Sequence, residues 1–170
     1  TLELAPEFAR LHRQRVEPEL LEAARSLEPW WEPALAVLPS LEGSRVELAH
    51  ALGPRGRVYG DRIVVGAPVP WTGMDPRISV VLLLHERAVH DSAHPEHALA
   101  EWEALTGLSV RMREAPAALQ QAHAAWLASL ELAPLLEALR DRGRIHAAIH
   151  DRLLRSPEHR APCLASLADA

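Results

Sequence analysis

Lysine and asparagine are both absent from this chain of 170 residues, and all 18 basic side chains are arginines. The absence of lysine excludes P-loop nucleotide hydrolases, kinases of the common type and enzymes that form a Schiff base. Acidic residues outnumber basic ones by 23 to 18, the net charge is −5, and no segment is a basic block. We therefore expect no nucleic-acid partner, and we interpret the arginine-only composition as codon bias.

Cysteine and glycine are scarce, and long hydrophobic runs are missing. The single cysteine, Cys163, cannot form a disulfide within the chain, which is typical of a reducing compartment. The eight glycines form no phosphate-binding loop and no dinucleotide fingerprint. The longest apolar run, residues 78–84, is too short to span a bilayer, and the first residues show no signal-peptide pattern. These absences predict a cytoplasmic protein with no membrane partner and no nucleotide cofactor.

Prolines mark the expected helix starts in the N-terminal part, residues 1–43. A proline fits the first turn of a helix but stops a helix that runs into it. Pro6, Pro18 and Pro29 therefore predict three short helices in this part of the chain.

After residue 43 the apolar residues recur at every second position, which is the period of a strand. Apolar residues alternate over 45–52, and a Gly-Pro turn separates them from a second segment, 57–65, which predicts a hairpin. The beginning of the first segment also fits a helix capping box, with Ser44 as the cap and Glu47 three residues later. We favour the hairpin.

Residues 78–84 are apolar on both faces, as expected of a central strand covered on both sides. A helix over 95–105 and a short strand over 108–113 follow. The segment 44–113 is therefore expected to form a small sheet with one helix.

Helices return in the C-terminal part, residues 114–155, where they are expected from Pro116, from Pro134 and along the stripe of Ile145, Ile149 and Leu153. The tail, residues 156–170, is expected to be loose. The whole pattern predicts a helix-rich α+β fold in a single domain, residues 1–170, around a small, mostly antiparallel sheet of about four strands.

Histidines carry the main chemical signal, because four of the ten lie between residues 85 and 97. A loop after a buried strand is a common place for ligand-binding side chains. Histidines with nearby carboxylates could hold zinc, or iron with open coordination positions. The candidate metal ligands here are His85, Glu86, His90, His94 and His97.

The spacing within this cluster does not match a known metal motif. His85-Glu86 resembles the start of the zinc-protease pattern, but His90 comes one residue too late to share a helical face with His85. A solvated loop is therefore the competing interpretation. A second pair, His146 and His150, is spaced four residues apart on a predicted helix and could reach one ion, although two ligands do not make a site.

Tryptophan is the commonest aromatic residue, with five copies against one tyrosine and one phenylalanine. Trp30 and Trp31 cannot both face inward on a helix, because adjacent side chains point about 100° apart. Trp71 stands in a loop rich in proline and glycine. Exposed tryptophan is enriched at binding interfaces, so these three residues are candidate partner contacts. The competing interpretation for each of them is packing in the core.

Two functional hypotheses follow from these patterns. The first is a non-catalytic protein-binding partner or accessory subunit, which docks another protein through its acidic N-terminal helices and exposed tryptophans. The alternative is a metal-dependent enzyme or metal-binding protein that uses the histidines between residues 85 and 97. No complete set of catalytic residues is visible in the sequence.

Overall fold

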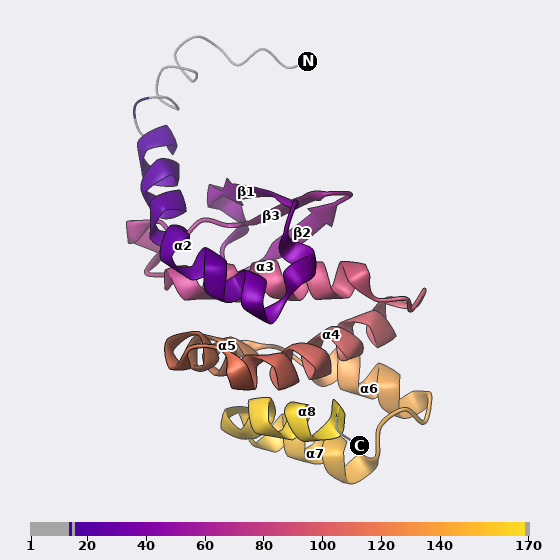
Figure 1. Ribbon diagram of the computed structural model, residues 1–170. Coiled ribbons are helices and arrows are strands. Elements are labelled where there is room, and N and C mark those ends of the chain that lie inside the picture. The colour runs from indigo at the N-terminus through magenta and orange to yellow at the C-terminus, as the bar shows by residue number, and fades with distance from the viewer. Residues whose placement is uncertain (1–13, 15, 169–170) are drawn as a thin grey trace.

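The computed structural model describes residues 14 and 16–168, except for the side chains of Ala51 and Trp71. The helix expected from Pro6 lies outside these residues. Helices predominate in the described part, as predicted: α2 (Glu17–Val37), α3 (Pro76–Asp91), α4 (His97–Arg111), α5 (Ala117–Ser129), α6 (Ala133–Asp141), α7 (Ala147–Arg155) and α8 (Arg160–Ala168). The strands are β1 (Arg45–Ala49), β2 (Gly56–Tyr59) and β3 (Arg62–Gly66). Figure 1 shows α3 in the middle, with the sheet on one side of it and α4 and α5 on the other.

The first described helix, α2, continues through the point where the sequence predicts a new helix. Pro29 and Pro33 lie inside it, although a proline removes one backbone hydrogen bond from a helix interior. The buried face of α2, which includes Ala23, Leu27 and Ala34, packs mainly against α3. We attribute the continuity of α2 to this packing, because tertiary contacts supply most of the stability of a protein helix.

The sheet has three strands in the order β1-β3-β2, not the mostly antiparallel arrangement of about four strands that the sequence predicts. β1 pairs parallel with β3, and β2 pairs antiparallel with β3. The expected hairpin between β1 and β2 is therefore wrong, and the hairpin turn lies at Gly60 and Asp61 instead. Gly60 has a φ of +65°, which suits the first central position of a tight two-residue turn.

The run predicted as a central strand forms the core of α3. Seven consecutive residues, Ser79 to His85, are buried because α2, α4, α5 and the sheet surround this helix. A short run that is apolar on all sides fits a buried helix as well as a buried strand, so periodicity alone could not separate them. The strand expected over 108–113 is likewise helical, because Leu108 and Met112 lie four residues apart on the buried face at the end of α4.

The described part of the C-terminal tail, residues 156–168, is mostly helical and not loose as the sequence predicts. After a short 3₁₀ turn, η6 (Pro157–His159), α8 packs against α4 and α5 with Cys163 and Leu164 buried. Pro162 lies in the first turn of α8, where its missing N–H removes no hydrogen bond within the helix. Among the helices of the described part, none is both long and apolar enough to cross a membrane.

Candidate functional site

A polar pocket of about 270 Å³ lies between α3, α4 and the start of β2. Four titratable side chains that could act on a ligand line it, from two neighbouring helices: His85, Glu86, His97 and Glu101. Arg55 and Arg57 contribute positive charge from the chain that leads into β2. Of the predicted metal ligands, the structure thus brings three together and adds Glu101.

Two of the residues that line the pocket, the buried His85 and Glu101, are hydrogen-bonded to each other. His85 Nε2 lies 3.0 Å from Glu101 Oε1, and the imidazole packs against the Trp126 ring with centroids 4.8 Å apart. Burial alone would raise the pKa of Glu101, but the hydrogen bond from His85 and the charges of His85 and His97 lower it below its usual value. Glu101 is therefore held as a carboxylate.

The pKa of Glu86 is shifted in the opposite direction, above its usual value. Burial raises the pKa of its carboxyl, against the charge of His85, and the negative charge of Glu101 raises it further. Its side chain lies against Gly56, where a β-carbon would come within 2.5 Å of Glu86 Cγ. Two carboxyl groups in one pocket with opposite pKa shifts can divide the roles of anion and proton donor. No serine, threonine or cysteine is among the described residues that line the pocket.

The remaining predicted metal ligands lie elsewhere. His90 and His94 are exposed near the C-terminal end of α3, and His94 Nε2 is 3.9 Å from Glu103 Oε2. His146 caps α7 by accepting the backbone N–H of Ala148, and His150 lies beside Asp151. Within residues 14 and 16–168, no group of three histidine, cysteine or acidic side chains is arranged to hold a metal ion.

Glu101 was missed at the level of sequence, although a signal for it exists. It stands four residues after His97, so the two side chains share one face of a helix. It also stands three and four residues before the buried Ala104 and Leu105, so it borders the buried side of α4, where a carboxylate needs a partner. The partner, His85, is distant in sequence and could not be paired with it from spacing alone.

Comparisons with models of known families, with curated proteins and with solved structures found no match.

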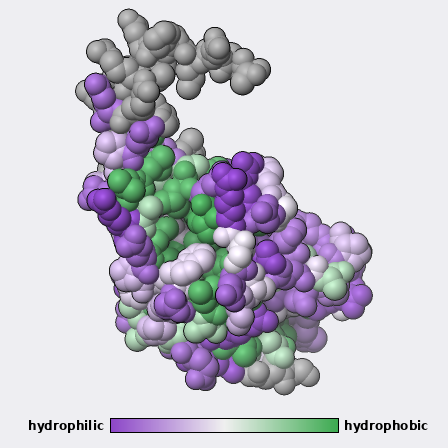
Figure 2. Space-filling model, turned by 45° about the horizontal axis from the view of Figure 1, so that its top comes forward, coloured by the Kyte–Doolittle hydropathy of each residue, from purple (hydrophilic) through white to green (hydrophobic). Residues whose placement is uncertain are grey.

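An apolar crevice of about 230 Å³ opens between α2 and β1, with α3 as its floor. Figure 2 shows hydrophobic surface gathered between α2, at the left edge, and the strands. One charged residue, Glu28, is among the residues that line the crevice: Ala24, Leu27, Glu28, Trp31, Val46, Leu48, Val80 and Leu83. The crevice thus resembles an unfilled part of the core that opens to solvent.

The three tryptophans predicted as partner contacts have different surroundings. Trp31 is half-buried and lines the crevice. Trp30 is half-buried under the guanidinium of Arg77, which lies 5.8 Å from the ring centroid and pairs with Asp75. The side chain of Trp71 lies outside the described residues. Of the two tryptophans whose side chains the structure describes here, Trp31 lines the crevice and Trp30 does not.

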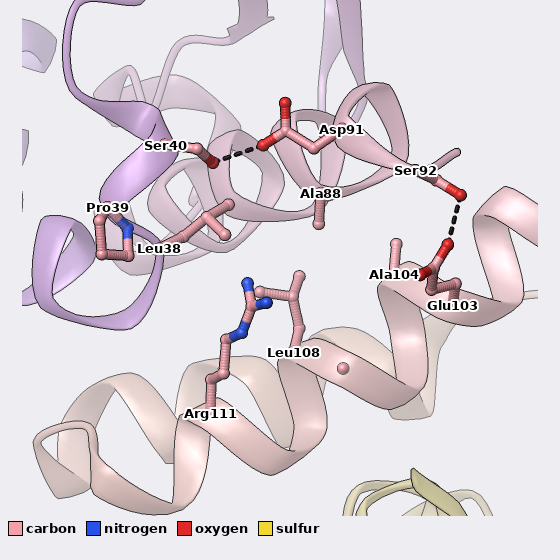
Figure 3. Close-up of a pocket in the computed structure, with 11 residues that line it drawn as sticks. Leu38, Pro39, Ser40, Ala88, Asp91, Ser92, Glu103, Ala104, Leu108 and Arg111 are labelled. Atoms are coloured by element: carbon pink, nitrogen blue, oxygen red, sulfur yellow. Dashed lines mark hydrogen bonds between the residues drawn. The ribbon is translucent and has the colours of Figure 1, made fainter. Parts of the chain in front are cut away.

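A cleft of about 560 Å³ lies between α4, the end of α3 and the 3₁₀ turn η2 (Pro39–Leu41). Figure 3 shows Ser40 bonded to Asp91 and Ser92 bonded to Glu103 at its edges, while Arg111 points into it. The two carboxylates are thus already hydrogen-bonded within the chain. Although this cleft is wider than the polar pocket, it brings together no buried titratable group.

Proposed function

We propose that this chain is a non-catalytic protein-binding domain whose crevice between α2 and β1 receives a large apolar side chain of its partner. The observation that carries the proposal is the opening between Trp31 and Leu48 onto the buried helix α3. Tryptophans that line a well-packed pocket are frequent hot spots of protein interfaces. A partner side chain in the crevice would bury both its own apolar surface and that of the crevice.

The charge of α2 indicates the kind of segment that carries this side chain. The described helix has five acidic residues, Glu17, Glu19, Glu22, Glu28 and Glu32, against one basic residue, Arg25. Complementary charge guides association and excludes wrong partners. We therefore infer a partner segment with one apolar anchor residue flanked by arginine or lysine.

The same proposal includes a cytoplasmic location and no partnership with nucleic acid or membrane. A single buried thiol, Cys163, and the acidic net charge support these points.

A labelled synthetic peptide tests the proposal directly. The probe has one phenylalanine between two arginine pairs, and its matched controls carry alanine in place of phenylalanine or glutamate in place of arginine. We expect fluorescence anisotropy to show saturable binding of the probe and at least tenfold weaker binding of both controls, because the crevice needs the anchor and α2 needs the positive charge.

Variants of the protein locate the binding surface. Trp31→Ala should weaken probe binding about tenfold or more, whereas Leu21→Ala should leave it unchanged. Leu21 is a suitable control because it is an exposed apolar residue of α2 that does not line the crevice. Circular dichroism melting checks that both variants fold. Equal binding by wild type and Trp31→Ala, or no binding by any peptide, would show the proposal to be wrong.

A further inference from the structure

The strand β1, which forms one wall of the apolar crevice, lies at an edge of the sheet and pairs there with β3. The N–H of Arg45 donates to the carbonyl of Asp61 at 2.9 Å, and the carbonyl of Ala49 accepts from the N–H of Ala67 at 3.0 Å. In a parallel pair, every second residue of such a strand directs both of its backbone groups to the neighbour. Arg45, Glu47 and Ala49 therefore use their backbone groups to bond β3.

The two residues between them, Val46 and Leu48, direct their N–H and carbonyl groups away from β3, to the outer side of the sheet. Within the described part of the chain, these groups have no hydrogen-bond partner. The side chains of Val46 and Leu48 lie beside the buried Ile63 and Val65 of β3 and line the crevice. The same two residues thus offer unpaired backbone groups at the edge and apolar side chains to the crevice.

This combination suits an extended partner segment. An unpaired strand edge is a template for another strand, and peptides that bind in this way gain affinity from main-chain hydrogen bonds and specificity from side-chain pockets. Alternate side chains of an added strand face the same side, so a residue beside Val46 or Leu48 would point to the crevice. An amphipathic helix would instead dock through several anchors along a longer groove and would leave the backbone groups of β1 unpaired.

We propose that the partner segment binds as a fourth strand on the outer edge of β1, with its apolar anchor in the crevice and its backbone hydrogen-bonded to Val46 and Leu48. This inference rests on the proposed function, because it describes how the same segment occupies the same crevice. It adds the conformation of the partner, which is extended, and the part of the partner that the protein recognises, which includes the main chain.

Two N-methylated forms of the labelled peptide test the added strand. One carries the methyl group on the nitrogen of the phenylalanine, and the other carries it on the nitrogen of the arginine that follows, so the two are isomers with identical side chains. Successive N–H groups of a strand point to opposite sides. One methyl group would therefore lie between the peptide and β1, whereas the other would point away from the sheet.

We expect one isomer to bind at least about tenfold more weakly than the unmethylated peptide, because it loses a main-chain hydrogen bond and places a methyl group against β1. The other isomer should bind within about twofold of the unmethylated peptide. The identity of the weaker isomer gives the direction of the added strand. Loss at the phenylalanine means an antiparallel strand, and loss at the arginine means a parallel strand.

Amide hydrogen exchange of the protein gives a second readout. In the free protein, the unpaired N–H groups of Val46 and Leu48 should exchange faster than that of Glu47, which is bonded to β3. Saturating peptide should slow the exchange of Val46 and Leu48 by about tenfold or more and change that of Glu47 much less. Measurement by NMR resolves the three amides.

The outcomes separate this inference from the proposed function. If the unmethylated peptide binds wild type and Trp31→Ala weakens it, but the two isomers bind with equal affinity, the crevice receives the anchor without an added strand. The proposed function then stands and the strand inference is overturned. Unchanged exchange of Val46 and Leu48 in the complex overturns it as well. No binding by the unmethylated peptide overturns both.

Discussion

Three histidines are buried among the described residues: His85, His123 and His150. They differ in their hydrogen-bond partners. His85 has Glu101 as a hydrogen-bond partner, and His150 has Asp151. His123, on α5, has no hydrogen-bond partner for its Nε2 within the described chain, and its ring lies 6.1 Å from that of Trp126. A buried imidazole without an acidic partner favours its neutral form.

The burial of His123 predicts a loss of stability in mild acid. Burial lowers the pKa of His123 to about 4, and the charge of His85 adds to the effect. Between pH 6.5 and pH 4 the unfolded chain therefore binds a proton that the folded chain does not, and the free energy of unfolding falls as the pH falls. The loss from this residue reaches about 3 kcal/mol below pH 4. Urea unfolding at several pH values measures it.

The variant His123→Gln is the control for this prediction, because glutamine is polar but does not titrate. Its unfolding free energy should decline less than that of wild type between pH 6.5 and pH 4. Parallel declines for the two proteins would assign the acid sensitivity to other groups.

At the scale of elements, the sequence prediction is wrong where a helix is buried on several sides. The sequence predicts α5, α6 and α7 close to their observed positions, because Pro116 and Pro134 mark the starts of the first two and an apolar stripe with the helical period marks the third. α3 has no such stripe over Ser79 to His85, since every side of it is covered. The candidate site shares this limitation, because the pairing of His85 with Glu101 depends on how α3 packs on α4.

Two glycines in different elements allow a matched test of close backbone packing. A β-carbon on Gly66, at the end of β3, would lie 1.6 Å from the carbonyl oxygen of Gly53. Gly66→Ala should therefore push the end of β3 away from Gly53, in the connection between β1 and β2. It should lower the free energy of unfolding by about 3 kcal/mol or more. A β-carbon on Gly107, within α4, would meet no atom within 4 Å. Gly107→Ala should therefore stabilise the protein by about 0.5–1 kcal/mol. Chemical denaturation compares the two, and equal effects would contradict the geometry.

Arg160 connects three helices through their backbones. Its guanidinium donates to the carbonyls of Leu127 and Leu130 at the end of α5, at 2.7 and 2.8 Å, and to the carbonyl of Leu153 in α7, at 2.9 Å. The last carbonyls of a helix have no partner within the helix, and a cation there is favourable.

Arg160→Met should therefore lower the free energy of unfolding by about 3 kcal/mol, because it leaves buried carbonyls without donors. Arg160→Lys should lose less, since an ammonium keeps the charge but not the fork of donors. Thermal and urea unfolding of both variants measure the effect. A methionine variant as stable as the lysine variant would mean that packing, not hydrogen bonding, is what Arg160 contributes.

At the scale of the whole molecule, α3 is shared by two groups of elements. The sheet and α2 pack on one side of it, and α4 and α5 pack on the other, with α8 beyond them (Figure 1). Because both groups need α3 to cover their apolar faces, we expect them to unfold together as one cooperative unit.

The buried thiol of Cys163 on α8 reports on that cooperativity. If the molecule is one unit, Gly66→Ala in the distant sheet increases the labelling rate of Cys163 by the same factor as it increases the unfolded fraction. That factor is about a hundred for a loss of about 3 kcal/mol, when labelling is slow compared with refolding. Reaction of the native protein with a thiol reagent, alongside urea unfolding, gives both factors. A Cys163 labelling rate unchanged by Gly66→Ala would instead mean that α4 to α8 stay folded while the sheet opens, which would divide the chain into two units at α3.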